Sequence, residues 1–424
     1  MAIVECGPGK LYTTIAAAWA VMANGDTMDV FAGTYSGAGN TALSLGGKSN
    51  VIIQQHGSDL VIIDGLTATS NLWDFQGTVA TITLRGIKFV DPASSCVVLR
   101  SGLTGASIVD CYMKLGAQGN YGVYCVGTCD LDLSGTTICQ YDDGTPNAAS
   151  TYGVYAPTNA TVTIDDLCVF HSLAINIYSA GTSAVAVKRS LIHSYDWALG
   201  SSYGFQNAGT GLCSIENSIV VGFTVGAGNT LTDNAMAVRH CLFDSCTSAV
   251  LANKFCSVIK NNIFVYNNKA IYGDNGGDQP SPNSNHFWNN TTDVYQYTAA
   301  THSTGGDPQF TNRAAHDYSL IAYILGVEGH YQKTPCIDTG EWLAAVAEDY
   351  LGNPRPRNAY YDIGPYESQE NGCIYTNRAA ETATGECTYW KSPHAPDPLM
   401  VYHPALPNPA DFQDFVVTRI RGAS

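Results

Sequence analysis

The feature that most constrains this chain is a short phrase that returns every 21–31 residues between about residues 79 and 266. Each copy has two alternating apolar residues, a polar or glycine pair, and two or three further apolar residues, as in ATITLRGIKFVD and TVTIDDLCVFHS. Aligned on the apolar residue before the polar pair, the copies share one position, occupied by Leu84, Val109, Leu133, Ile164, Val187, Ile215, Val238 and Ile259. A repeat of this length, made of strands and turns, predicts a solenoid.

Each repeat has room for about three short strands. A second strand-like run stands between the copies, as at residues 96–99, 121–124 and 152–155. Because one rung cannot bury its inward face alone, neighbouring rungs are expected to stack around a narrow continuous core. Side chains alternate along a strand, so Val162 and Ile164 should point inward while Thr163 faces out.

Residues 12–23 precede the repeats and have helical spacing. The apolar residues fall on one stripe of such a helix: Ile15, Ala18, Trp19 and Met22. Thr13 or Thr14 can cap its start, and Asn24-Gly25 ends it, because both residues tolerate the left-handed conformation. A short strand over residues 27–31 and a tight turn follow, so the helix is expected to cover the end of the coil.

Two segments carry a resemblance to a known family. The opening GDTMDVFAGTY, and the closing series GDPQF, DYSL, TPCIDTG and DYLGNPRPRNAYYDIGPYE, resemble right-handed parallel β-helix, pectate-lyase-like proteins of bacteria and phages. The resemblance implies an all-β, right-handed parallel β-helix with an N-terminal capping helix, and the proline-rich residues beyond its closing series predict an extended C-terminal tail. The chain is thus expected to have a cap helix at 1–24, the β-helix at 25–300, irregular C-terminal coils at 301–368, and a hairpin with an extended arm at 369–424.

The charge balance limits the partners. Lys and Arg number 20 against 36 Asp and Glu, and the net charge of −16 argues against nucleic acid or an anionic membrane. No apolar run approaches the ~18 residues of a membrane span, and the first residues, MAIVE, lack a secretory signal. These traits suit a virion protein that works outside the cell after lysis. They also suit a mature secreted or cell-surface protein.

The fourteen cysteines divide into two groups. Many stand within apolar strands, where a small residue packed between rungs is expected: Cys96, Cys111, Cys139, Cys168, Cys213, Cys241 and Cys256. Cys6, Cys373 and Cys387 lie outside the coil and are candidates for disulfides. No pair has the spacing and partners of a zinc site, so no cofactor is expected.

Polar residues at the bends supply the only candidates for chemistry. A pectate-type lyase needs carboxylates for calcium and an arginine base, and a hydrolase needs two acids about 5–10 Å apart. Asp165, Asp166 and Arg189 are the candidate catalytic residues. Further groups are Asp142-Asp143, Arg239, His171, His193 and His240, and the phrase GDNGGD at 273–278 as a calcium loop. Acidic pairs at turns are also common without catalysis.

Three functions remain open because this fold serves many. The first is a virion structural protein, a capsid decoration, collar or tail component. The arm at 369–424, rich in proline and in apolar anchors, would attach it to neighbouring subunits, including copies of itself. The second is a tailspike- or lyase-type polysaccharide-degrading enzyme, and the third is a carbohydrate-binding surface protein. The sequence favours the first over an enzyme.

Overall fold

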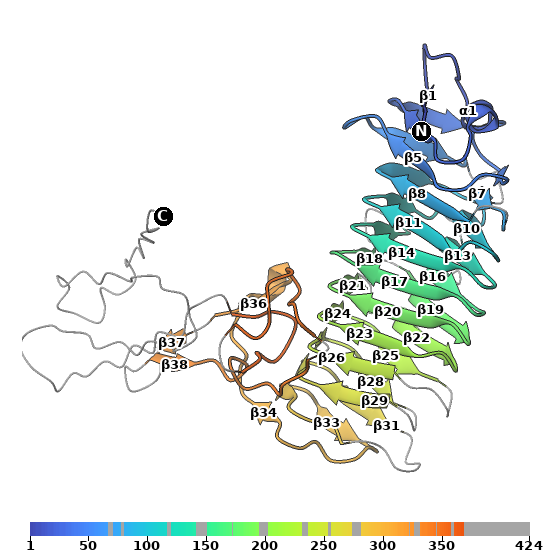
Figure 1. The fold of residues 1–424 in the computed structure, drawn as a ribbon. Coiled ribbons are helices and arrows are strands. Elements are labelled where there is room, and N and C mark those ends of the chain that lie inside the picture. Colours follow the sequence, from blue (N-terminus) through green and yellow to red (C-terminus); the bar gives the residue numbers. More distant parts are fainter. Residues whose placement is uncertain are drawn as a thin grey trace, which may run out of the picture.

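The chain folds into a stack of coils whose short strands form three long parallel sheets (Figure 1). The computed structural model describes residues 1–66, 71–77, 80–116, 120–140, 151–171, 173–194, 202–230, 236–252, 256–273, 281–321, 323–325, 331–344, 346–357 and 360–368. Each coil contributes one strand to each sheet, so neighbouring strands of a sheet come from successive coils. The parallel β-helix predicted from the repeat is confirmed.

The described strands lie in the sheets as follows. Sheet 1 contains β1 (Ile3–Cys6), β2 (Thr27–Val30), β5 (Val51–Gln55), β8 (Thr81–Arg85), β11 (Gly105–Val109), β14 (Asp130–Ser134), β17 (Thr161–Asp165), β20 (Ala184–Lys188), β23 (Cys213–Glu216), β26 (Met236–Arg239) and β29 (Cys256–Lys260). Sheet 2 contains β3 (Gly33–Ser36), β6 (Val61–Asp64), β9 (Ile87–Val90), β12 (Tyr112–Lys114), β15 (Thr137–Cys139), β18 (Val169–His171), β21 (Leu191–His193), β24 (Ile219–Val221), β27 (Leu242–Asp244), β30 (Ile263–Val265), β32 (His286–Trp288) and β34 (Thr304–Gly305). Sheet 3 contains β4 (Leu43–Leu45), β7 (Asn71–Phe75), β10 (Ser95–Arg100), β13 (Tyr121–Val126), β16 (Tyr152–Ala156), β19 (Ile175–Gly181), β22 (Tyr203–Gly209), β25 (Val225–Asn229), β28 (Ser248–Ala252), β31 (Lys269–Gly273) and β33 (Thr292–Tyr295).

The core is a column of apolar side chains that runs through the coils. Seven of the eight aligned positions are buried, each at most 2% exposed, from Leu84 to Ile259. The prediction for the eighth position, Val109, was wrong by one residue. Ile108 pairs with Leu84 and Leu133 in the ladder and is 1% exposed, whereas Val109 is half-buried. Two adjacent β-branched residues satisfy a period of two equally well in isolation, and only pairing with the neighbouring coils fixes which one faces inward.

The corner between sheets 1 and 2 has the same backbone conformation in many coils. The second residue after the buried apolar position has a positive φ, from 43° at Arg189 to 59° at Asp166, in the non-glycine cases. The next inward side chain is small and polar or a thiol, and it hydrogen-bonds to the backbone of the corner, as Cys241 Sγ does with the Ile215 carbonyl oxygen (3.4 Å). Asn262 Nδ2 likewise donates to the Val238 carbonyl oxygen (3.0 Å). The cysteines at this corner therefore stand where serine, threonine or asparagine stand in other coils.

One end of the stack is covered by helix α1 (Ile15–Val21). Thr14 caps it by accepting a hydrogen bond from the Ala17 amide (3.3 Å), and the predicted stripe is buried, with Ile15 and Ala18 fully so. The helix is shorter than the predicted 12–23. Strand β1, which the sequence analysis did not anticipate, precedes it and pairs with β2, so the coil begins before the helix. In the part of the chain described, no helix is long and apolar enough to span a membrane.

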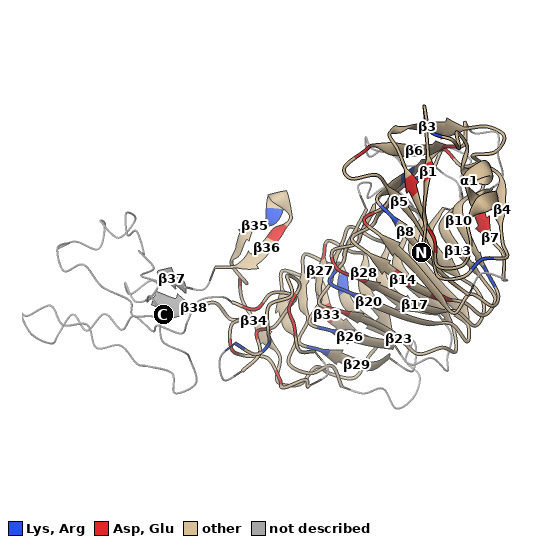
Figure 2. Cartoon of the chain, turned by 45° about the horizontal axis from the view of Figure 1, so that its top comes forward, with Lys and Arg blue, Asp and Glu red and all other residues tan. Residues whose placement is uncertain are grey.

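The segment after β34 leaves the coil and folds back on it. It contains the antiparallel pair β35 (Phe310–Asn312) and β36 (Asp317–Leu320), joined by the short helix η1 (Arg313–Ala315), and the pair β37 (Tyr323–Leu325) and β38 (Tyr331–Lys333). Figure 2 shows β35 and β36 beside the coil near β27. Residues 306–321, 334–344, 346–357 and 360–368 are called the covering segment here.

A second core cluster explains this arrangement. Strands β24, β27 and β30 carry aliphatic residues on the outer face of sheet 2, and these pack against Tyr318, Cys336 and Ile363 of the covering segment. Parallel sheets that are apolar on both faces need cover on both. The closing sequence series was expected to make the last irregular coils, but its described residues instead lie against the side of earlier coils.

Candidate functional site

The predicted acidic group lies at the corner between sheets 1 and 2. Arg189 Nε donates to Asp165 Oδ1 at 2.7 Å, and Arg189 Nη1 lies 3.5 Å from Glu348 Oε2 of the covering segment. The hydrogen bond to Asp165 raises the pKa of Arg189, which favours the charged form of the guanidinium. The structure thus brings Asp165 and Arg189 together, in an ion pair.

Asp166 takes a different place at the same corner. Its φ is 59°, and its Oδ2 accepts a hydrogen bond from Ser134 Oγ at 3.2 Å. Leu167 also has a positive φ (60°), so this coil turns through one extra residue. Glycoside hydrolysis needs two carboxylates that face each other across the scissile bond. The two aspartates here are consecutive residues of a bend and do not have this arrangement.

The candidate histidines lie under or beside the covering segment. His240 is fully buried, hydrogen-bonded through Nδ1 to Arg355 and through Nε2 to Asn261 Nδ2 (3.0 Å). Burial and the Arg355 charge hold the pKa of His240 well below its usual value. His171 and His193 are neighbours in sheet 2, and the His193 ring contacts that of His316 (4.5 Å between centroids). Because His240 is fully buried, a substrate has no access to it.

Other predicted candidates find no test in the structure. Asp142-Asp143, most of the GDNGGD phrase, and Cys373 and Cys387 lie outside the described residues. Cys6 is buried, and burial raises its pKa to about 11. It is a free thiol, as are all twelve cysteines in the described residues. Among the same residues, no group of three or more His, Cys, Asp or Glu side chains is placed to hold a metal ion.

A different feature stands out on the outer face of sheet 3. Strands β13 and β16 share the sequence Tyr-Gly-Val-Tyr, and in both the two tyrosines are partly exposed while the glycine and valine between them are buried. A Cβ on Gly122 would lie 2.7 Å from the Gly153 carbonyl oxygen and 2.5 Å from the Ile138 side chain. Only glycine allows the coils to approach so closely there. Two tyrosines three residues apart thus reach the same outer face.

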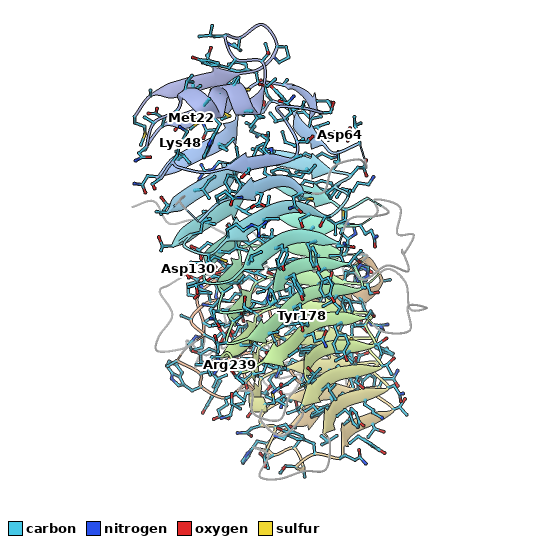
Figure 3. The ribbon with its side chains drawn as sticks, turned by 90° about the vertical axis from the view of Figure 1, so that its right-hand side faces the viewer. Met22, Lys48, Asp64, Asp130, Tyr178 and Arg239 are labelled. Carbon is cyan, nitrogen blue, oxygen red and sulfur yellow. The ribbon has the colours of Figure 1, made fainter. Side chains whose placement is uncertain are left out.

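Five tyrosine rings form one continuous cluster on this face. They are Tyr121, Tyr124, Tyr152, Tyr155 and Tyr178, and together they are called the tyrosine face. Ladder pairing aligns the rings of successive coils, and centroids of neighbouring rings are 4.7–5.6 Å apart. Figure 3 shows the side of the coil on which Tyr178 lies, near the middle of the stack.

The electrostatics of the tyrosine face are those of a neutral surface. Burial, together with the neighbouring hydroxyls, raises the pKa of Tyr155 to about 12. Burial also raises the pKa values of Tyr121 and Tyr152. The phenols therefore stay protonated at physiological pH, and each offers a flat apolar ring with a hydroxyl that can donate and accept. Such an array suits stacking on flat, weakly polar ligands.

A smaller aromatic pair lies farther along sheet 3. The rings of Tyr272 and Tyr295 are 5.5 Å apart, and Lys269 Nζ lies 4.3 Å from both centroids. This ammonium group occupies ring faces that a ligand would need. The pair is therefore a useful contrast to the tyrosine face.

The sequence analysis did not single out the tyrosine face. It recognised residues 121–124 and 152–155 only as strand-like runs. The missing signal was the repetition of Tyr-x-x-Tyr at the same point of successive coils. In a strict alternation of side chains these tyrosines would face opposite sides, and two consecutive inward residues between them bring them to the same side.

Comparison with known proteins supports the architecture. No family model matches the chain, and no curated protein is significantly similar to it. Among solved structures, the pectate lyase Pel9A superposes with a TM-score of 0.57 at 11% sequence identity, over 87% of this chain and 96% of that one. At this identity the likeness extends to the fold alone, and that fold is the right-handed parallel β-helix.

Proposed function

We propose that this chain is a non-catalytic β-helix that binds a neutral polysaccharide along the tyrosine face. The carrying observation is the row of partly exposed rings on successive coils. Because the rings stack on one another, a ligand would contact their exposed edges and hydroxyls. Ring edges can pack against the C–H groups of pyranose rings, and the tyrosine hydroxyls can bond to sugar hydroxyls. Exposed aromatic groups on an ordered surface commonly mark interaction sites.

The spacing of the rings suits an extended chain of sugars. Successive strands of a sheet lie about 4.8 Å apart, which is similar to the length of one pyranose residue in an extended β-linked polymer. Such a polymer presents flat ring faces along its length, and the tyrosine face offers rings at matching intervals. A single small ligand would use only one or two of the five rings.

Charge selects the kind of polysaccharide. One solved structure with this fold is named as a pectate lyase, and pectate is an acidic polysaccharide. The present chain carries a net charge of −16, which repels a polyanion. The tyrosine face consists of neutral phenols. We therefore assign a neutral ligand, of the class of cellulose, mannan or chitin.

Binding to insoluble polysaccharide tests the proposal. The full chain is incubated with cellulose, mannan and chitin, with pectate as the charged comparison, and the bound fraction is measured against concentration. The double variant Tyr155→Ala/Tyr178→Ala should bind about tenfold to hundredfold more weakly, since each stacked ring contributes about 0.5–1.5 kcal/mol. Tyr272→Ala is the matched control and should bind as the parent does. Equal binding by the double variant, or no binding by the parent, would refute the proposal.

A structural role in a virion remains a separate proposal. It depends on the arm at 369–424, which lies outside the described residues, and its support is the proline-rich, apolar composition of that arm. A chain ending at residue 368 should fold but fail to join a larger assembly. Light scattering of the shortened chain beside the full chain measures this. Normal assembly of the shortened chain would exclude the arm as the attachment.

A further inference from the structure

A pocket of about 210 Å³ lies where the chain leaves the coil. Its walls come from the corner after β30, from the end of β32, and from the start of the covering segment. It shares no residue with the tyrosine face, and the inference drawn from it goes beyond the proposed function. Small-molecule sites usually measure about 300–1,000 Å³, so this pocket fits one small ring.

Two aromatic side chains from adjacent coils line one wall, and because Arg313 lies over one face of Tyr266, the ring on which a ligand would stack is that of Trp288. Trp288 ends β32 and pairs with Val265 of β30, and Tyr266 follows Val265 with a φ of 55°. Tyr266 is 41% exposed, and Trp288 is partly buried against the second core cluster. Phe310 stands on the covering segment and is held edge-on against Tyr318 (5.2 Å between centroids). The aromatic wall is therefore fixed from both sides.

Arg313 supplies a rigid donor at the pocket. Its Nε and Nη2 bond to the two carboxylate oxygens of Asp244 at 2.7 and 2.6 Å, and its guanidinium carbon lies 3.8 Å from the Tyr266 ring centroid. Asp244 is itself 3% exposed and accepts a further bond from the Tyr318 hydroxyl (2.8 Å). Within the described part of the chain Arg313 Nη1 makes no hydrogen bond, so it is available to a ligand.

Asp307 supplies an acceptor beside this donor. Its side chain is exposed, and Oδ1 accepts from the Gln309 amide at 2.8 Å, which fixes the loop. A carboxylate and a guanidinium that line one pocket match a pair of neighbouring hydroxyls, because each hydroxyl both donates and accepts. Asp244 neutralises Arg313, so the Asp307 carboxylate is the uncompensated charge of the pocket, and it disfavours an acidic sugar.

We propose that this pocket binds one neutral pyranose, a free monosaccharide or the end residue of a glycan, stacked on Trp288 with neighbouring hydroxyls held by Asp307 and Arg313. Three features carry the inference: the volume, the aromatic wall, and the paired donor and acceptor. The site is a half-open pocket of the size of a single ring, whereas the tyrosine face is an extended surface.

Saturation-transfer NMR on the full chain tests the assignment, with glucose, galactose, mannose and N-acetylglucosamine as neutral probes and glucuronate and glucosamine as charged ones. At least one neutral sugar should give a signal at millimolar concentration, and glucuronate should bind more weakly. Trp288→Ala should reduce the affinity about tenfold or more. The double variant of the tyrosine face should bind the monosaccharide as the parent does.

Because Trp288 also packs against the second core cluster, Asp307→Asn at an exposed residue provides the second variant. It should leave the melting temperature unchanged, weaken the neutral sugar about tenfold, and narrow the gap to glucuronate. The assignment is overturned if no neutral sugar binds, if both variants bind as the parent does, or if glucuronate binds as well as the neutral sugars. None of these results bears on the binding of polysaccharide at the tyrosine face.

Discussion

Two outer faces of the coil differ in how they meet their surroundings. Sheet 2 at β24, β27 and β30 presents aliphatic side chains outward, and the covering segment buries them. Sheet 3 at β13, β16 and β19 presents tyrosines outward, and these remain partly exposed. Both faces stand on the same kind of strand and over the same column of core residues.

The difference follows from the chemistry of the side chains. An aliphatic residue gains only from removal from water, so a row of them requires cover. Tyrosine has an apolar ring and a polar tip, so it can stack on its neighbours and still meet water. The chain's own cover marks the face that serves stability, and the uncovered aromatic face is the one to which the proposed function assigns a ligand.

The largest effect should come from the core that both faces share. Ile164→Asp places an unpaired charge in the column, at a cost of several kcal/mol, and no soluble folded protein is expected. Thr163→Asp, on the outward side of the same strand, is the control and should fold. Soluble yield and circular dichroism measure both. A folded Ile164→Asp protein would contradict the inward placement.

A pair of tyrosine substitutions compares the two faces directly. Tyr318 is 1% exposed in the second core cluster, so Tyr318→Ala should cost about 3–5 kcal/mol and loosen the covering segment. Tyr178→Ala should cost less than about 1.5 kcal/mol, because its ring is only partly buried. Urea denaturation gives the free energies of unfolding, and limited proteolysis reports cleavage within residues 306–368. Equal losses would remove the distinction between the faces.

Lowering the pH should affect the stability of the covered face and leave the tyrosine face unchanged, with a smaller effect than the substitutions above. Burial, with the neighbouring His316 and His171, lowers the pKa of His193 to about 4. The folded pKa lies below the ordinary value of about 6.5, so this contribution is complete above pH 6.5 and is lost as pH falls through about 4. The melting temperature should drop by several degrees over this window, and the drop should be smaller in His193→Gln. Polysaccharide binding by the tyrosine face should not change there, because the phenols stay neutral. An identical pH profile in the variant would contradict this role of His193.

The smallest effect is expected at the acidic corner. Asp165→Ala removes a partly exposed ion pair with Arg189 and should cost about 0–1 kcal/mol. A screen on acidic and neutral polysaccharides should detect no turnover in the parent, in Asp165→Ala or in Asp166→Ala. Turnover that these substitutions abolish would favour the polysaccharide-degrading enzyme instead.

Most of the fold could be predicted from the repeat in the sequence. Residues such as Ile164 and Val238 recur at the spacing of one coil and have no other arrangement that buries them together. Ile108 shows the limit, because the choice between Ile108 and Val109 depends on pairing with the next coil. The path of the covering segment depends on contacts between residues such as Leu242 and Tyr318, far apart in sequence.

The candidate sites were harder to predict for the same reason. Asp165 and Arg189 stand one coil apart at the same bend, but the position of Glu348 beside Arg189 has no local signal. The tyrosine face needs two consecutive inward residues in each of its strands, and this departure from alternation appears only when the coils are stacked. Trp288 and Arg313 belong to the coil and to the covering segment respectively, so their pocket exists only in the folded chain.

The buried cysteines can report how this molecule unfolds locally, because each thiol becomes reactive only when its coil opens. Thiols stand along the stack from Cys6 in the first strand through Cys168 and Cys241 to Cys336 in the covering segment, and burial keeps them protonated and unreactive. Because each rung is held only by its neighbours, opening spreads from a weak point to adjacent rungs. Brief pulses of a thiol-reactive label, read by mass spectrometry, would time that spread coil by coil, with no foreign probe introduced into the chain.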